Sequence, residues 1–169
     1  MVTRYALAPM DRLLRALTWF CLAAPVILGF AASQAPAPFR TILFGTVGLM
    51  FTMYVVIWLV MRPTAFVVAP DGLVIEWPVR RRLIEASAIT GARVIDANER
   101  RRELGRVVRV GAGGLGGGFG LARTSRGMLE LWVSRTDWMV LVECRGRRSL
   151  LLTPEDPEQF VRALLRRAA

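Results

Sequence analysis

The chain has 169 residues, with 23 basic and 13 acidic side chains, a net charge of +10 and a sequence pI of about 11.5. Every basic residue is arginine, so the chain lacks histidine, the commonest general base and metal ligand. The two cysteines, Cys21 and Cys144, are too far apart in the sequence to indicate a disulfide framework or the cluster of ligands that zinc needs. We therefore expect no structural metal and no cofactor.

Charged residues are distributed unevenly along the chain. Residues 1–61 contain five charged side chains, whereas residues 62–169 contain 19 arginines and 12 acids. This division indicates an apolar N-terminal segment followed by one domain of about 100 residues. The sequence therefore predicts a membrane anchor in residues 1–62 and a separate domain in residues 63–169.

Two apolar runs, residues 13–32 and 41–61, dominate the predicted anchor. Each is about 20 residues long, which is enough to cross roughly 30 Å of hydrocarbon as a helix. A helix buried in a soluble core is the alternative, but two such runs in so short a chain favour transmembrane helices. The linker Ser33–Arg40 contains two prolines and predicts a tight helical hairpin. Gly45, Gly48 and Thr52 share one side of the second run and are expected to let the helices approach closely.

Arginines flank the predicted helices asymmetrically. Arg40 is the only basic residue between the two runs. The other flanking arginines lie before or at the start of the first run, or after the second, at positions Arg4, Arg12, Arg15, Arg62, Arg80, Arg81 and Arg82. Because basic residues accumulate on the cytoplasmic side, both termini and the domain are expected to be cytoplasmic. The alternative is a cleaved signal peptide in residues 1–35, which leaves the domain cytoplasmic as well.

Short apolar runs alternate with polar or glycine-rich breaks from residue 63 onward, which predicts about seven strands. The predicted strands are 65–70, 73–79, 92–97, 106–110, 128–134, 138–144 and 149–152. Pro70-Asp71-Gly72 is expected to turn the first hairpin and Arg145-Gly146-Arg147 the last.

The last element is predicted to be a helix. Thr153 is the expected N-cap and Pro154 the first helical residue, with acids in the first turn. Four apolar side chains then recur at helical spacing, namely Phe160, Val161, Leu164 and Leu165. The fold class is therefore predicted to be α+β: a transmembrane helical hairpin, then a bent antiparallel sheet or partly open barrel closed by a C-terminal helix.

Three stretches resemble small bacterial two-span membrane proteins that carry a bacterial pleckstrin-homology domain. They are YALAPMDRLLRALTW near the N-terminus, GGLGGGFG in the domain, and DWMVLVECRGRRSLLLTPEDPEQFVRAL at the end. The resemblance implies a pleckstrin-like roll of seven strands with a C-terminal capping helix, and a multi-pass protein of the bacterial cell membrane. It implies no established reaction or ligand.

The glycine-rich segment Gly111–Gly120 satisfies the G-x-G-x-x-G spacing of dinucleotide-binding turns. Such a turn must open a helix, and the glycines from Gly116 to Gly120 are very poor helix formers. We expect a flexible loop or a bulged strand connection instead, with Leu115 and Phe119 as its large side chains and candidate contacts to a membrane or partner.

Two arginine clusters stand out in the domain. Arg80, Arg81 and Arg82 follow the first hairpin and are the candidate contacts to anionic lipid, since cations near a cytoplasmic leaflet gain roughly 1 kcal/mol each. Solvated loops are the alternative. A second cluster, residues 100–102, is partly neutralised by Glu99 and Glu103. The first hairpin turn carries only an acid, which does not favour specific phosphoinositide binding.

Nucleic-acid binding and catalysis are both disfavoured by the sequence. The tryptophans of the domain lie in predicted strands rather than in a stacking row among cations. The candidate acids, Glu76, Glu130, Asp137 and Glu143, are scattered, and no nucleophile and base occur at a recognisable spacing. We therefore expect no nucleic acid, no small-molecule substrate and no enzymatic activity.

These observations lead to one functional hypothesis and one alternative. The first is a membrane-anchored interaction module whose domain is held at the cytoplasmic face of the bilayer to bind a protein partner or a second copy. The alternative is a sensor or binder of anionic membrane lipid. The two differ in whether binding depends on the arginine clusters.

Overall fold

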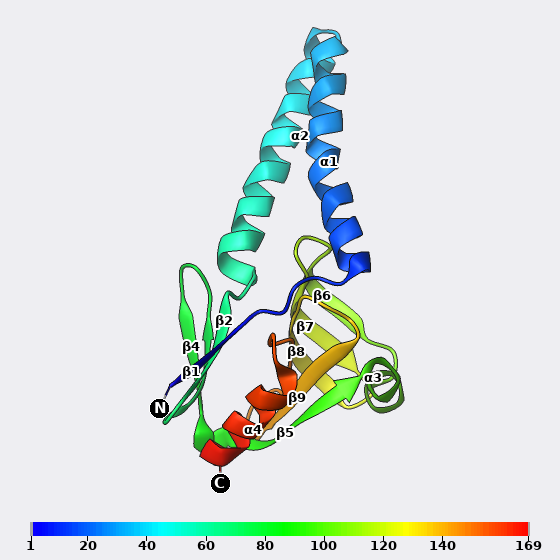
Figure 1. The fold of residues 1–169 in the computed structure, drawn as a ribbon. Helices are drawn as coiled ribbons and strands as arrows, with labels where there is room; N and C mark the ends of the chain where they lie inside the picture. Colours follow the sequence, from blue (N-terminus) through cyan, green and yellow to red (C-terminus); the bar gives the residue numbers. More distant parts are fainter. Residues whose placement is uncertain (1, 169) are drawn as a thin grey trace.

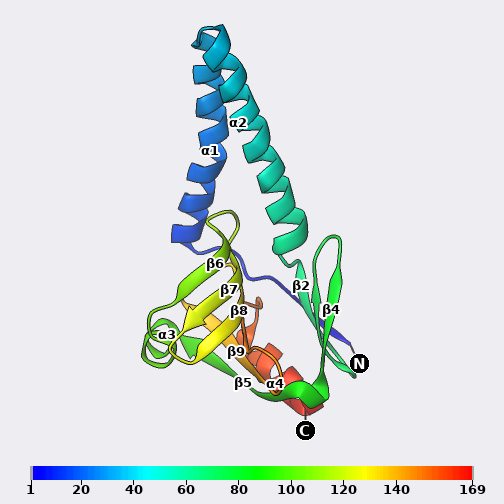
Figure 2. The same cartoon turned by 180° about the vertical axis from the view of Figure 1, so that it is seen from behind.

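The computed structural model describes residues 2–168 and consists of a helical hairpin that stands on a β-domain (Figure 1). Helix α1 spans Arg12–Gln34, and helix α2 spans Ala37–Val56 and continues as a π-helical turn, Ile57–Met61. The helices lie together at their far end and diverge toward the domain in both views (Figures 1 and 2). Both are long and apolar enough to cross a membrane, and none of the most apolar window of α2 is buried. A helix of a soluble core would be buried, so that alternative does not fit.

The glycines of α2 do not face α1, contrary to the prediction. A Cβ atom added at Gly45 or Gly48 would meet nothing within 4 Å. The contact between the helices includes instead a hydrogen bond of 2.7 Å from the Tyr54 hydroxyl to the carbonyl of Cys21. Close approach through Gly45 and Gly48 is therefore not how this hairpin packs.

Within residues 2–168, ten strands form two sheets. The four-stranded sheet has the order β1-β2-β3-β4, with β1 at Thr3–Ala6, β2 at Ala65–Ala69, β3 at Gly72–Glu76 and β4 at Arg81–Glu85. The six-stranded sheet has the order β5-β9-β10-β8-β7-β6. Its strands are β5 Ile89–Asp96, β6 Val108–Gly113, β7 Gly118–Thr124, β8 Gly127–Val133, β9 Trp138–Cys144 and β10 Leu150–Leu152.

Strand β1 precedes the hairpin in sequence but belongs to the first sheet. It pairs antiparallel with β2, placing Thr3 opposite Val68 and Ala6 opposite Ala65. The sequence division at residue 62 had assigned these residues to the anchor. Strand β1 has only four residues, and Tyr5 alone is half-buried, so its sequence carries almost no strand pattern. Its partner strand, β2, lies about 60 positions further along the chain. The hairpin is thus an insertion between two neighbouring strands.

The predicted first and last hairpins are both confirmed, as β2–β3 and β9–β10. Strand β10 also pairs in parallel with β8, so the second sheet is mixed rather than purely antiparallel. Strands β4 and β7 were not predicted. Only Ile84 is buried in β4, and glycines interrupt the apolar pattern of β7, so neither strand has a clear alternation.

Helix α3, Ala97–Leu104, was also not predicted. Asp96 and Glu99 form a complete capping box at its start, in which each side chain accepts a hydrogen bond from the other residue's backbone N–H. This D-x-x-E spacing is visible in the sequence and could have located the helix. The second arginine cluster is therefore helical rather than part of a loop.

Two apolar clusters hold the domain together. The first lies between the two sheets under the C-terminal helix, and the second lies on the other face of the six-stranded sheet, with Leu104 of α3. Alternate residues of β10 divide between them, since Leu150 and Leu152 belong to the first cluster and Leu151 to the second. A sheet buried on both faces explains the continuous apolar runs in β9 and β10.

Helix α4, Pro157–Ala168, closes the first cluster, but it starts later than predicted. Asp156 accepts a hydrogen bond from the backbone N–H of Gln159 at 2.9 Å, so it takes the capping role expected of Thr153. Thr153 is instead buried and bonded to Ser134. Pro157 then supplies the first helical residue, a position where its missing N–H costs nothing.

The apolar face of α4 should account for much of the domain's stability. Phe160 and Leu164 are fully buried, whereas Leu165 is 41% exposed. We expect Phe160→Ala to lower the free energy of unfolding by about 3–5 kcal/mol and Leu164→Ala by about 2–5 kcal/mol. Leu165→Ala is the matched control and should change it by less than about 0.5 kcal/mol. Denaturant titration of the full-length protein in detergent, followed by tryptophan fluorescence, measures the difference, and equal effects at positions 164 and 165 would contradict the assigned packing.

Candidate functional site

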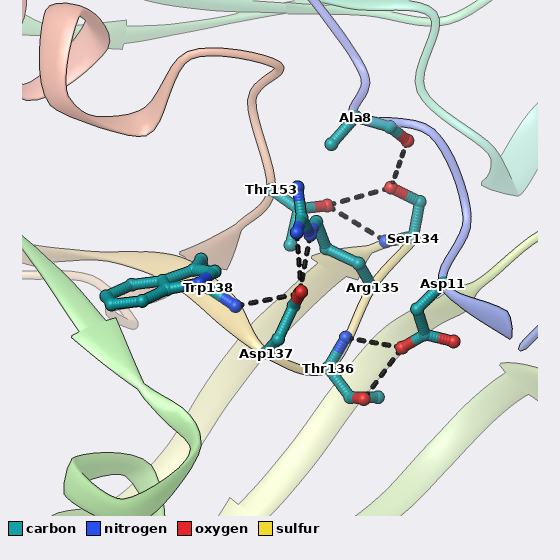
Figure 3. A network of polar contacts seen from close by, with 8 residues as sticks. All are labelled: Ala8, Asp11, Ser134, Arg135, Thr136, Asp137, Trp138 and Thr153. Atoms are coloured by element: carbon teal, nitrogen blue, oxygen red, sulfur yellow. Dashed lines mark hydrogen bonds and ion pairs between the residues drawn. The ribbon is translucent and has the colours of Figure 1, made fainter. Parts of the chain in front are cut away.

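The segment between β1 and α1 is hydrogen-bonded to the connection between strands β8 and β9 of the six-stranded sheet (Figure 3). Asp11 accepts hydrogen bonds from the backbone N–H and the hydroxyl of Thr136, at 2.8 and 2.7 Å, and also caps α1 through the N–H of Leu14. The buried hydroxyl of Ser134 donates to the carbonyl of Ala8. We call residues 8–11 the strap, because they join the start of α1 to the β8–β9 connection.

Two carboxylates of this region are held in the ionised form. Burial raises the pKa of Asp11, but hydrogen bonds from Leu14 and Thr136 outweigh that effect and leave the pKa below its usual value. Arg135 donates two hydrogen bonds to Asp137 and lowers the pKa of that carboxyl to about 2. Both groups are therefore charged at neutral pH, and Asp11 can serve both as helix cap and as acceptor for Thr136.

The glycine-rich connection between β6 and β7 is a tight hairpin loop that reaches up between the diverging helices (Figures 1 and 2). The Thr18 hydroxyl oxygen lies 2.8 Å from the carbonyl oxygen of Gly114 and accepts a hydrogen bond from Gly116 N–H at 3.0 Å. Added Cβ atoms would meet Leu17 at position 114 and Arg62 at position 116, each at 3.3 Å or less, and both glycines have positive φ angles. The glycines are thus needed for close approach to both helices.

The two candidate contacts of this loop lie inside the molecule. Leu115 is 6% exposed and lies at the base of the space between the helices. Phe119 is 2% exposed and belongs to the first apolar cluster. While buried, Phe119 is not available to a partner. The loop is ordered against the chain's own helices, so its contact with a bilayer or a partner remains a prediction that rests on Leu115.

The turn between β3 and β4 points in the same direction as the helices, and its tip is level with their lower ends (Figures 1 and 2). Trp77 N–H donates to the carbonyl of Arg80 and closes the turn, while the indole of Trp77 donates to the carbonyl of Met61 at 3.1 Å. The Arg80 guanidinium stacks on the Trp77 ring at 4.3 Å. Val79, at the tip, is 61% exposed. The turn therefore presents one apolar and one cationic side chain beside the end of α2.

The other two arginines of this cluster are engaged in ion pairs. Arg81 is highly exposed and pairs with Glu76 at 3.2 Å. Arg82 pairs with the nearly buried carboxylate of Glu130 at 2.6 Å. Because neighbouring residues of a strand point to opposite faces, Arg81 and Arg82 cannot act on the same surface. The three predicted lipid contacts therefore divide into an exposed pair, Arg80 and Arg81, and a structural residue, Arg82.

The second arginine cluster lies on α3, at some distance from this turn (Figure 1). Arg100 and Arg101 line a pocket that also contains Leu14 and Thr136. Glu103, which follows the cluster in the sequence, pairs with Arg93 and Arg126.

The candidate acids are dispersed among separate ion pairs. Glu76 pairs with Arg4 and Arg81, and Glu130, Asp137 and Glu143 each pair with a different arginine. Within residues 2–168, no group of three or more histidine, cysteine or acidic side chains is close enough to hold a metal ion. These acids are therefore held in separate ion pairs with arginines.

Comparison with known proteins gives one family match. A model described as a bacterial PH domain matches residues 64–168, which is more than half of the chain. Searches of curated proteins and of solved structures found no match. The matched segment begins at β2, so the family model does not include the N-terminal strand that completes the sheet.

Thr18 should determine how firmly the loop is held between the helices. Thr18→Val keeps the shape of the side chain but leaves the Gly116 N–H without its acceptor, at a cost of about 1–3 kcal/mol for a buried group. We expect faster amide hydrogen exchange in residues 113–118 and a lower unfolding temperature. Thr52→Val is the matched control, since the exposed Thr52 hydroxyl bonds only to Gly48 of its own helix. Unchanged exchange in Thr18→Val would show that the glycine packing alone holds the loop.

Proposed function

The chain belongs to the bacterial PH domain family, and from this premise we propose that it is a membrane-anchored, non-catalytic interaction module that binds a protein partner or a second copy. The single observation that carries the proposal is the double attachment of α1 to the domain. The strap holds Asp11 to Thr136, and Thr18 holds the loop at Gly114 and Gly116. A domain attached in this way has one orientation relative to the helices and therefore presents the same face to any partner.

The apolar surface of the hairpin supports insertion into a membrane. Aromatic and aliphatic side chains are exposed along both helices, including Phe20, Phe30 and Leu49. Such a surface is stable in a bilayer and would aggregate in water. The pairing of β1 with β2 also supports an uncleaved N-terminus, because removal of residues 1–35 would take away an edge strand of the first sheet. We propose an anchor formed by residues 12–61 and a cytoplasmic domain formed by residues 63–169 with β1.

Anionic-lipid binding is a second candidate, and the β3–β4 turn favours it. The turn that contains Val79 and Arg80 stands level with the ends of the helices, and the next residue, Arg81, is exposed. An apolar residue followed by cations is suited to the interface of a bilayer, where the side chain enters the hydrocarbon boundary and the charges stay among phosphates. Lipid contact by this turn is compatible with the partner hypothesis, since it leaves the side of the domain with both termini free for a partner (Figure 1).

The proposed topology predicts that both termini are cytoplasmic. Reporter fusions at the N-terminus, at Pro36 and at Ala169 test it with alkaline phosphatase, which is active outside the cytoplasm, and a fluorescent protein, which folds inside it. We expect phosphatase activity only for the fusion at Pro36, because the arginine asymmetry keeps the ends of the hairpin inside. Phosphatase activity at Ala169 would overturn the orientation.

The two candidate functions can be distinguished by measuring vesicle binding of a soluble variant before and after its exposed arginines are neutralised. Because β1 and the strap are part of the fold, Leu13–Met61 is replaced by a flexible Gly/Ser linker instead of truncating the chain at residue 63. We expect this variant to bind anionic vesicles weakly, with little headgroup preference and with loss of binding as salt rises, since exposed charges are screened beyond about 8 Å at physiological salt. The double substitution R80Q/R81Q should abolish that binding without changing the unfolding temperature.

Arg82→Gln is the matched control for the same turn. It should lower stability by about 1–3 kcal/mol, because Glu130 loses its ion-pair partner in a nearly buried position, and should change vesicle binding less. Affinity capture of the full-length R80Q/R81Q protein from its native membrane gives the complementary readout. If the double variant captures the same proteins as the wild type, the interaction-module hypothesis is supported. If the soluble variant instead binds one headgroup tightly and at high salt, the protein is a lipid sensor.

A further inference from the structure

An apolar groove lies between the diverging ends of α1 and α2. Its volume is about 340 Å³, which is within the range of about 300–1,000 Å³ usual for ligand pockets. Side chains of both helices form the walls, and Leu115 of the β6–β7 loop lies at the base, between the helices and the domain. The lining residues used below are Leu22, Phe51, Val55, Trp58 and Leu115.

The length of the groove identifies the depth at which it lies. From Phe51 to Trp58 the helix rises by about 10 Å, at 1.5 Å per residue. Half of the hydrocarbon core is about 15 Å thick. The groove therefore occupies the leaflet on the side of the domain and ends before the bilayer midplane. Beyond it, the helices come together at the far end of the hairpin (Figures 1 and 2).

The limited length of the groove indicates which kind of molecule can occupy it. A transmembrane helix is about 10 Å wide and needs a contact surface along most of the bilayer, which a groove confined to one leaflet does not provide. An acyl chain is narrow, fully apolar and anchored at the interface. A single leaflet lipid, with its chain between the helices and its headgroup at the level of the domain, matches the groove in both length and chemistry.

Arg62 lies where that headgroup would be. Its guanidinium stacks on the ring of Trp58, a wall residue of the groove, with 4.3 Å between Cζ and the ring centroid. Its Nε atom is buried and has no hydrogen-bond partner, and among residues 2–168 no carboxylate lies within ion-pair distance of Arg62. Burial lowers the pKa of Arg62 from its usual value but leaves the group charged at neutral pH. A half-buried cation without a protein counter-ion calls for an external anion.

We propose that the groove binds one anionic phospholipid of the domain-side leaflet, with an acyl chain between α1 and α2 and the phosphate at the guanidinium of Arg62. The inference rests on membrane insertion under the proposed function but not on the lipid contact of the β3–β4 turn. The bound chain would also contact Leu115, so the same lipid touches both helices and the loop of the domain. Lipid occupancy would then stabilise the attachment of the domain to its anchor.

The test is native mass spectrometry of the full-length protein in detergent, titrated with phosphatidylglycerol or with phosphatidylcholine of the same chains. We expect the wild type to retain one phosphatidylglycerol about tenfold more tightly than phosphatidylcholine. Arg62→Gln should remove this preference, as expected for a charge-assisted hydrogen bond, and Arg62→Lys should keep part of it. Arg15→Gln is the matched control, because Arg15 is an exposed cation at the start of α1 and does not line the groove.

A second pair of variants tests the position of the acyl chain. Val55 lines the groove, whereas the neighbouring Val56 is similarly exposed and does not. Val55→Trp should fill the groove and reduce retention of both lipids by about tenfold, and Val56→Trp should leave it unchanged. R80Q/R81Q should likewise leave it unchanged, because the turn is a separate surface.

Three results would overturn the proposal. The first is equal phosphatidylglycerol retention in Arg62→Gln and Arg15→Gln, and the second is retention unaffected by Val55→Trp. The third is a change of oligomeric state in Val55→Trp without a change in lipid, which would assign the groove to a second copy. Carbonate extraction of native membranes separates this failure from failure of the proposed function. A protein that resists extraction but binds no lipid refutes only the lipid site, and an extracted protein refutes both.

Discussion

The pairing of β1 with β2 is the constraint on which the rest of the structure depends. These strands are neighbours in the sheet, yet the whole helical hairpin lies between them in sequence. Both ends of the hairpin are consequently fixed to the same sheet. A single flexible tether would let a domain swing, whereas two attachment points leave it one orientation. The tight contacts of Asp11 with Thr136 and of Trp77 with Met61 reinforce the two ends separately.

The divergence of the helices is a consequence of this double attachment. The strap carries the start of α1 to Thr136 of the six-stranded sheet, whereas the end of α2 stays beside the four-stranded sheet through Trp77 and Met61, and the β6–β7 loop enters between the helices. Only glycine allows this approach, since side chains at positions 114 and 116 would meet Leu17 and Arg62. The helices still come together at the other end, so the space between them tapers. The apolar groove therefore results from the attachment of the helix ends to the domain, and not from the packing of the two helices alone.

The excess of arginine has different roles at different positions. Several acids of the domain form ion pairs with arginines, as for Arg82 with Glu130 and Arg93 with Glu103. Such partly exposed pairs contribute modestly to stability. Arg62 and Arg80, for which no carboxylate partner is described, stack on Trp58 and Trp77 close to the end of α2. These two cations therefore lie on the side of the domain that faces the hairpin.

The sequence by itself determined the two apolar helices, the α+β order, the first and last hairpins and the apolar face of α4. Each of these follows from local periodicity or a local turn. It did not determine β1, the parallel β8–β10 pair, the separation of Arg82 from Arg80 and Arg81, or the burial of Phe119. Those features depend on contacts between residues far apart in the chain, such as Thr18 with Gly114, and leave no periodic trace. The groove and its unpaired Arg62 were decided only by tertiary structure, because a cavity and a missing counter-ion are properties of the assembled neighbours of a residue.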